Sequence, residues 1–321
     1  MKNIKSRIVL GIIYSIAFIG LFYLCIGCYF AYVAVGNFNL TTFVTTFEKQ
    51  RADSTFDVAR WDTLVKHDIN LKSDFGYSVN GMFVENGTPS DTTVVICHGV
   101  ACNKWLMIRY ADLYLSLGYN VVLYDQRGHG VSGGEYSTFG YTEKFDLQKM
   151  VELVAEQHLG VVIGAHGESM GAATVLLHAG MINAHTPDSL PHISFYIADC
   201  PYSDLKKQLT YRLKEEYHIP NIGIVEAASL WSHWLYGFWF GEVNPIAHIQ
   251  DVKVPVLFIH GDADTYVPTS MSEEFYSAKP EPKMLYLSPN ANHAMSYRVN
   301  KDEYRSRVET FRSRFLGQRN L

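Results

Sequence analysis

The chain has 321 residues, enough for one large domain or two modest ones. Apolar residues make up 48% of it and charged residues 18%, so the composition provides ample material for a buried core. The formal net charge is -5, and the sequence has no basic stripe, no basic tail and no groove-like pattern of aromatic and basic residues. This composition argues against nucleic acid as a partner.

The first predicted element is an apolar segment without any charge, residues 8–35. A membrane-spanning helix needs ~20 apolar residues, so this segment can cross a bilayer with some tilt. Lys2, Lys5 and Arg7 precede it, and the next charged residue is Glu48. The positive-inside rule therefore predicts a single-pass protein of the cell membrane, with a cytoplasmic N-terminus and the rest of the chain extracellular.

Two alternatives to an anchor stay open. A cleaved signal peptide has an apolar core of ~7–15 residues and a small-residue cleavage site, whereas this run is longer and "YVAVGN" is a poor site. A lipid anchor at Cys28 is the other alternative, because "LCIGC" loosely resembles a lipobox. We expect a retained anchor within residues 1–36, followed by a juxtamembrane segment over residues 37–60.

Five cysteines occur, at positions 25, 28, 97, 102 and 200. The first two lie in the apolar segment, which leaves an odd three and no disulfide framework. Cys97 and Cys200 each end an apolar run, which predicts that they are small buried residues. A bridge between Cys97 and Cys102 is the alternative.

From residue 61 onward, short apolar runs alternate with helix-like stretches. Strands are predicted over residues 62–73, 78–87, 91–99, 161–167, 193–201, 254–264 and 283–290, and residues 119–134 indicate a strand that runs into a glycine-rich loop. Helices are predicted over residues 105–118, 141–158 and 302–316, and from residue 169. This alternation, with strands that are apolar throughout, predicts an α/β domain over residues 61–321, with a mostly parallel sheet and helices on both faces.

One region interrupts the alternation, at residues 203–249. It indicates two or three helices with no strand between them, which we interpret as a helical cap inserted after the sixth strand. Its aromatic residues are Trp231, Trp234, Tyr236, Phe238, Trp239 and Phe240. We expect most of them to pack the cap onto the body; lining an acyl pocket and touching the membrane surface are the alternatives.

A candidate nucleophile lies in "HGESMG", which fits the pattern G-x-S-x-G around Ser169. A serine hydroxyl is a poor nucleophile until a neighbouring base takes its proton. The flanking glycines allow the sharp turn from strand to helix that exposes such a side chain, and here an apolar strand precedes the turn and a helix of small residues follows it. The alternative is that Ser169 is an ordinary helix N-cap.

The same pattern predicts an acid and then a histidine later in the chain. "LFIHGDADTYVP" supplies Asp262 and Asp264 after one strand, and "LSPNANHAMSY" supplies His293 after the last. Imidazole titrates near neutral pH and suits a proton shuttle. The acid would hold the imidazole in the tautomer that accepts the serine proton.

These motifs together resemble the α/β-hydrolase superfamily, in particular its branch of esterases, lipases and serine-aminopeptidase-like proteins. The resemblance covers residues 60–317 and is carried by "CHGV", "YDQRGHGVSGG", "HGESMGA", "HGDADTYVP" and "NANHAMSY". It implies that Asp264 is the catalytic acid and that Asp262 makes a local contact. It also implies that the backbone amides of Val100 and Met170 form the oxyanion hole, where such donors contribute ~3–4 kcal/mol in the transition state.

The resemblance further implies that His98, Asp125 and Arg127 brace the loops around the site. No metal site is predicted, since no H-E-x-x-H motif occurs and no C-x-x-C pair lies outside the membrane segment. No cofactor is implied either, because the chain lacks a Walker-type loop and a dinucleotide fingerprint. An aspartate nucleophile, as in haloalkane dehalogenases, is excluded by Ser169.

The sequence therefore predicts a membrane-anchored serine hydrolase that acts on a small ester or acyl substrate, with the lipid bilayer contacted through residues 8–35. A peptidase or amidase of the same fold is the alternative, and Glu215 or Glu216 could then bind a peptide N-terminus. A non-catalytic, membrane-anchored interaction module is the alternative from a different class. The sequence leaves the oligomeric state open.

Overall fold

The computed structural model describes residues 2–36, 43–157, 162–185 and 192–317. Its contacts divide the chain into two compact units. The first unit joins residues 1–38 to residues 206–242, and the second comprises residues 39–205 and 243–321. Part of the predicted juxtamembrane segment, residues 37–42, lies outside the described residues.

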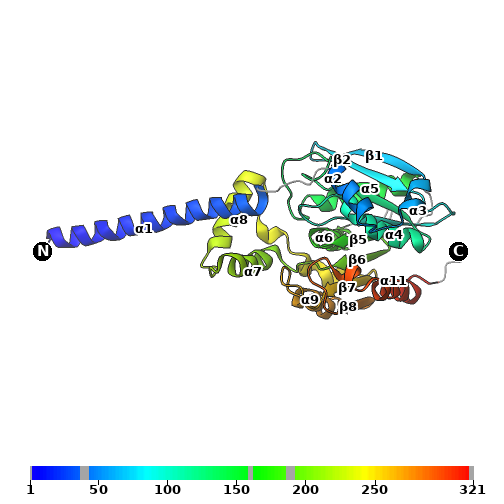
Figure 1. The fold of residues 1–321 in the computed structure, drawn as a ribbon. Coiled ribbons are helices and arrows are strands. Elements are labelled where there is room, and N and C mark those ends of the chain that lie inside the picture. The colour runs from blue at the N-terminus through cyan, green and yellow to red at the C-terminus, as the bar shows by residue number, and fades with distance from the viewer. Residues whose placement is uncertain (1, 37–42, 158–161, 186–191, 318–321) are drawn as a thin grey trace. The chain divides into compact units, whose positions relative to one another are not determined.

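The second unit is built on an eight-stranded sheet (Figure 1). Its strands are β1 (Lys66–Lys72), β2 (Ser78–Val84), β3 (Thr92–Cys97), β4 (Asn120–Tyr124), β5 (Val162–Glu168), β6 (Phe195–Asp199), β7 (Val256–Gly261) and β8 (Lys283–Ser288). They lie in the order β1-β2-β4-β3-β5-β6-β7-β8. The β1–β2 and β2–β4 pairs are antiparallel and all the others are parallel, so the predicted mostly parallel sheet is confirmed.

Helices cover both faces of this sheet. The helical segments of the second unit are α2 (Phe43–Ala52), α3 (Val58–Thr63), η2 (Lys104–Met107), α4 (Ile108–Ser116), α5 (Glu143–Gln157), α6 (Met170–His185), η4 (Pro245–Asp251), α9 (Ser270–Ala278), α10 (Ser296–Val299) and α11 (Lys301–Phe315). One core cluster packs α4 and α11 against residues such as Ile96 and Leu257 of the sheet. A second cluster packs α5, α6 and α9 against the other face, where Val95 and Phe258 point. Strands β3 and β7 are buried on both sides, which explains their continuous apolar sequences.

The first unit consists of helices alone among its described residues. It contains α1 (Lys2–Ala31), which continues into a π-helical turn η1 (Tyr32–Gly36), together with α7 (Leu205–Tyr217), α8 (Ile224–Tyr236) and η3 (Phe240–Glu242). The stretch Ser6–Gly36 is long and apolar enough to cross a membrane. The predicted helical insertion after the sixth strand is therefore present, without a strand among its residues.

The chain leaves the second unit after Leu205 and returns at Val243, and these two residues are joined by a hydrogen bond of 2.9 Å from the Leu205 N–H to the Val243 carbonyl. The insertion therefore starts and ends just beyond the carboxyl end of β6. Within the first unit, α8 packs against α1, so the apolar N-terminal segment and the insertion form one unit. That the aromatic residues of the insertion pack it onto the body stays a prediction.

Candidate active site

Ser169 lies on a tight turn between β5 and α6. Its φ is +56°, its N–H donates to the Asp199 carbonyl at 2.8 Å, and its own carbonyl accepts from the Ala173 N–H at 3.0 Å. A helix N-cap ordinarily has an extended backbone, so this left-handed conformation differs from the simple N-cap alternative. The turn is of the kind that exposes a nucleophile at the end of a sheet.

The two glycines around Ser169 are required by close backbone approach. A Cβ added at Gly167 would lie 2.1 Å from the Gly171 carbonyl oxygen. A Cβ added at Gly171 would lie 2.1 Å from the carbonyl oxygen of Cys97, at the end of β3. The G-x-S-x-G pattern thus reflects the packing of the turn and of the start of α6 against the neighbouring strand.

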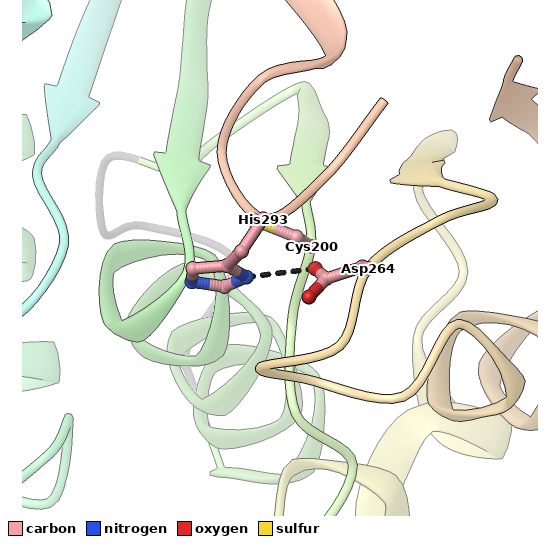
Figure 2. Close-up of side chains that lie close together, drawn as sticks. All are labelled: Cys200, Asp264 and His293. Carbon is pink, nitrogen blue, oxygen red and sulfur yellow. Dashed lines mark hydrogen bonds and ion pairs between the residues drawn. The ribbon is translucent and has the colours of Figure 1, made fainter. Parts of the chain in front are cut away.

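His293 and Asp264 reach Ser169 from two other loops. His293 follows β8, and its Nε2 accepts from the Ser169 hydroxyl at 2.9 Å. Its Nδ1 donates to Oδ2 of Asp264 at 2.7 Å, and Asp264 follows β7. Figure 2 shows the imidazole facing this carboxylate. Because a carboxylate only accepts hydrogen bonds, Nδ1 carries the proton and Nε2 is left to accept the serine proton.

Asp264 is held as an anion by four donors. Its Oδ1 accepts from the N–H groups of Tyr266 at 2.8 Å and Val267 at 3.0 Å, and its Oδ2 lies 3.1 Å from Nε2 of the buried His260. Burial alone would raise the pKa of the Asp264 carboxyl, but the hydrogen bonds from His260 and His293 outweigh it and hold that pKa below its usual range. The carboxyl is therefore ionised at neutral pH.

Asp262 has a different environment. It is exposed, and its Oδ1 accepts from the Asn290 N–H at 2.7 Å. This is the local contact that the resemblance implies for Asp262. Of the two candidate acids, Asp264 alone bonds to His293.

Cys200 lies beside the pair formed by Asp264 and His293 (Figure 2), and ligand atoms of the three residues are within 4.8 Å of one another. A metal would need the thiolate of Cys200. Burial raises the pKa of this thiol well above its usual value, so the thiol stays protonated. Both ring nitrogens of His293 are already hydrogen-bonded. The donor set therefore does not fit a metal.

The loop after β3 passes beside Ser169. A Cβ added at Gly99 would lie 3.4 Å from Cβ of Ser169. His98 fixes the start of this loop: its Nδ1 bonds to the Gly99 carbonyl at 2.7 Å, and its Nε2 accepts from the Gln126 N–H at 2.9 Å. Burial lowers the pKa of His98 to about 3, so the ring stays neutral and can accept at Nε2.

Val100 follows Gly99 in this loop, and Met170 directly follows Ser169 as the first residue of α6. The next loop residue, Ala101, has a φ of +57° and donates its N–H to Nε2 of His129 at 3.1 Å. The two amides expected to bind the oxyanion therefore belong to the two segments that flank the nucleophile.

The loop that carries His129 is braced as the sequence analysis expected. The buried Asp125 pairs with Lys104 at 2.6 Å and accepts from the Val131 N–H at 3.1 Å. Arg127 lies between the rings of Tyr77 and Tyr136, with its guanidinium carbon 5.1 and 4.5 Å from their centroids. Both charged residues are thus engaged in holding the loop.

A buried polar network behind the nucleophile was not found from the sequence. Glu168, the residue before Ser169, pairs with the buried Arg109. The Tyr110 hydroxyl lies 2.7 Å from the Glu168 carboxylate and 3.0 Å from that of Asp199. Burial, together with the charge of Glu168, raises the pKa of Asp199 to about 7. Asp199 is therefore partly protonated at neutral pH.

The buried His260 and His129 were also missed. Both lie in motifs that carry the resemblance, "YDQRGHGVSGG" and "HGDADTYVP", but their partners, Ala101 and Asp264, are identified only once the loops are folded. The free cysteines resolve one alternative: Cys97 and Cys102 form no disulfide, and Cys97 and Cys200 are fully buried, as predicted.

Two family patterns match the chain. The family described as serine aminopeptidase, S33, matches residues 88–214, and the one described as PhoPQ-activated pathogenicity-related protein matches residues 241–321. The first range includes Ser169, and the second includes Asp264 and His293.

Several known proteins are similar to this chain in sequence or in structure. The chain is 42% identical to the YqkD protein of Bacillus subtilis over 268 residues, which cover 82% of this chain and 85% of that protein. It is 26% identical over 263 residues to the acylamino-acid-releasing enzyme of Homo sapiens, covering 73% of this chain and 33% of that enzyme. The esterase Pf2001 of Pyrococcus furiosus superimposes with a TM-score of 0.63 at 26% identity, over 79% of this chain and 94% of the esterase.

The fold and these similarities define a serine hydrolase of esterase or aminopeptidase type. The chain belongs to the α/β-hydrolase superfamily.

Proposed function

We propose that the protein is a membrane-anchored serine hydrolase that cleaves carboxylic esters through Ser169, His293 and Asp264. The observation that carries this proposal is the continuous chain of hydrogen bonds from the Ser169 hydroxyl to His293 at 2.9 Å and from His293 to Asp264 at 2.7 Å. A surface histidine without a catalytic role would not be expected to bond both to a serine with a left-handed backbone and to a buried carboxylate.

In the first half of the reaction, Ser169 Oγ attacks the ester carbonyl while His293 Nε2 takes the hydroxyl proton. The ionised Asp264 stabilises the imidazolium that forms. His293 then gives the proton to the leaving alkoxide oxygen, the bond from that oxygen to the acyl carbon breaks, and an alcohol departs. The acyl group remains on Ser169.

In the second half, His293 takes a proton from water as the water oxygen attacks the acyl carbon. The bond to Ser169 Oγ breaks, His293 returns the proton to that oxygen, and a carboxylic acid leaves. In both halves, negative charge develops on the carbonyl oxygen. We assign its stabilisation to the N–H groups of Val100 and Met170, supported by the proximity of Gly99 to Ser169 and by the left-handed turn at Ala101.

An ester with an apolar acyl part is the favoured substrate. The similarity to an esterase over 94% of its length supports an ester, and the aromatic residues of α8 support an apolar environment near the membrane. A peptidase or amidase is the second candidate, because the serine aminopeptidase family matches residues 88–214. Of the residues considered for binding a peptide N-terminus, Glu216 already pairs with Arg212.

The membrane anchor is α1, with residues 8–35 in or near the bilayer, the N-terminus in the cytoplasm and the second unit on the extracellular side. The length and apolar composition of Ser6–Gly36, together with the basic residues before it, support this assignment. A cleaved signal peptide would instead release the protein into the soluble fraction. Fractionation followed by a salt wash distinguishes the two, since only an anchored protein stays with the membranes.

The experiment that tests the chemistry is labelling of the full-length protein with a fluorophosphonate probe, beside a Ser169→Ala control. Labelling of the wild type alone is expected, followed by turnover of p-nitrophenyl esters in preference to aminoacyl amides. Faster turnover of the amides would favour the peptidase. Absence of labelling in folded wild type would favour a non-catalytic interaction module.

A further inference from the structure

In the first unit, α8 packs against the last turns of α1 at close range (Figure 1). A Cβ added at Gly27 would lie 2.7 Å from Cβ of Ala227, so glycine is what lets the two helices approach. Ala31 and Val35 follow Gly27 at intervals of four residues and are fully buried. Small residues on one face of a helix are typical of close helix pairs in membranes.

Two polar contacts fix the register of this pair. The Tyr23 hydroxyl donates to the Ile222 carbonyl at 2.6 Å, just before α8 begins. The Trp231 indole N–H donates to the Leu24 carbonyl at 2.8 Å. The start of α8 and the indole of Trp231 therefore lie at the level of Tyr23 and Leu24 along α1.

This level can be related to the depth of a bilayer. The hydrocarbon core is ~30 Å thick and needs ~20 helical residues, fewer than the charge-free stretch 8–35 offers. Since Arg7 stays outside the core, a span that begins at Ile8 ends close to Gly27. The turns after Gly27, including η1, then lie in the headgroup region, and α8 starts about one helical turn before the hydrocarbon ends, at the level of Tyr23.

Apolar side chains of the insertion are exposed, and two of them, Ile222 and Trp234, lie near this level. Trp234 packs edge-on against Trp231, with ring centroids 5.7 Å apart, and is 65% exposed. Ile222 is 61% exposed and Leu235 49%. Trp239, also exposed, stacks on His233. Tryptophan is enriched at the boundary between hydrocarbon and water, where the ring is in lipid and the N–H finds a polar partner.

Two acidic side chains nearby, Glu226 and Glu216, are paired. Glu226 is the one acidic residue in the sequence of α8, and it bonds to Lys206 at 3.2 Å and to Asn221 at 3.2 Å. Arg212 and Glu216 of α7 form a second pair. Pairing lowers the cost of holding these charges close to lipid, so they do not oppose a position in the headgroup region.

We propose that Ile222, Trp234, Leu235 and Trp239, here called the aromatic face, lie in the membrane–water interface of the leaflet where α1 leaves the hydrocarbon. The partner of this surface is the lipid bilayer. The inference rests on the proposed membrane anchor, and it makes the insertion a second membrane-bound element of the enzyme. Because the insertion starts and ends just beyond the carboxyl end of β6, these two connections also tether the catalytic unit to the bilayer.

The test uses the full-length protein in phosphatidylcholine vesicles whose acyl chains carry bromine at a shallow or a deep position. Bromine quenches tryptophan only at close range, and the tryptophans of the second unit, Trp61 and Trp105, are buried in its core. Shallow bromine is expected to quench more than deep bromine. Trp234→Phe and Trp239→Phe are expected to lose much of the quenched emission, whereas Trp61→Phe keeps it.

Two outcomes overturn different claims. If a carbonate wash extracts the wild type from the vesicles, the anchor itself is wrong. If the protein resists carbonate but Trp234→Phe and Trp239→Phe quench like the wild type, or aqueous iodide quenches Trp234 as it does a free indole, the aromatic face lies in water and only this inference fails. Fluorophosphonate labelling of each variant verifies that it is folded.

Discussion

His129 accepts the backbone N–H of Ala101 at 3.1 Å, and this bond ties the loop after β3 to the loop after β4. Ala101 has a φ of +57°, which an alanine adopts only at a cost, so the loop needs an external restraint. Burial lowers the pKa of His129, which keeps the ring neutral and able to accept at Nε2. We infer that His129 positions the neighbouring amide of Val100, the proposed oxyanion donor.

The first prediction is that His129→Ala slows ester hydrolysis without removing the nucleophile. A displaced oxyanion donor costs roughly 10²-fold in rate, so kcat should fall by about that factor while KM changes little. Steady-state kinetics on a p-nitrophenyl ester measure it. His67→Ala, an exposed histidine on β1, is the control and should behave as wild type. An unchanged kcat in His129→Ala would show that the loop does not need this bond.

The second prediction contrasts the two acids of one loop. Asp264→Asn should lower kcat by roughly 10⁴-fold, because an amide at this position favours the wrong tautomer of His293. Asp262→Asn should leave kcat close to wild type, since Asp262 bonds only to the Asn290 N–H on the surface. Kinetics of the two variants side by side decide the assignment. Equal losses, or a larger loss in Asp262→Asn, would contradict it.

The third prediction concerns pH and the buried Asp199. In the folded protein the pKa of Asp199 is raised from 3.8 to about 7, so between these pH values folding takes up a proton. The contribution of this proton to the free energy of unfolding is complete only below pH 3.8. That contribution is lost as pH rises through about 7. Asp199→Asn should remove this slope and raise the melting temperature relative to wild type at pH 8 more than at pH 5.

Thermal unfolding at the two pH values measures the effect, with Asp262→Asn as the exposed control. The prediction is contradicted if the melting temperature of the wild type rises from pH 5 to pH 8, and rises by more than that of Asp199→Asn. The carboxyl of Asp199 would then be ionised in the folded protein.

The sequence predicted the parts of the site that depend on local backbone geometry. Gly167 and Gly171 identify the turn at Ser169 because no side chain fits at either position. Asp264 follows β7 and His293 follows β8, and the carboxyl ends of parallel strands share one edge of the sheet, so their order along the chain was informative. The confirmed fold class follows from the same alternation of strands and helices.

Contacts between residues far apart in the chain could not be predicted from the sequence. Arg109 and Glu168 are 59 positions apart, and no sequence pattern around either residue predicts that the two form a pair. The pairing of α1 with α8 depends on Gly27 and Ala227, which resemble any small residues of an apolar helix. The pairing of the insertion with the N-terminal helix therefore could not be predicted.

The fourth prediction tests this helix pair with two glycines of the same helix. Gly27→Leu forces a side chain into a space that ends 2.7 Å from Ala227, and overpacking of this kind costs ~1–3 kcal/mol. Gly20→Leu adds the same side chain where nothing lies within 4 Å. Both changes keep the segment apolar, so membrane insertion should be the same for the two variants.

In vesicles, trypsin should cut α7 after Lys206, Lys207 or Lys214 several-fold faster in Gly27→Leu than in wild type or Gly20→Leu, because α8 no longer docks on α1 and the insertion opens more often. The cleavage rate, followed by mass spectrometry of the fragments, is the measurement. Equal rates in the two variants would mean that the insertion holds together without α1. The register that relates Trp231 to Leu24 would then lose its support, and with it the depth assigned to the aromatic face.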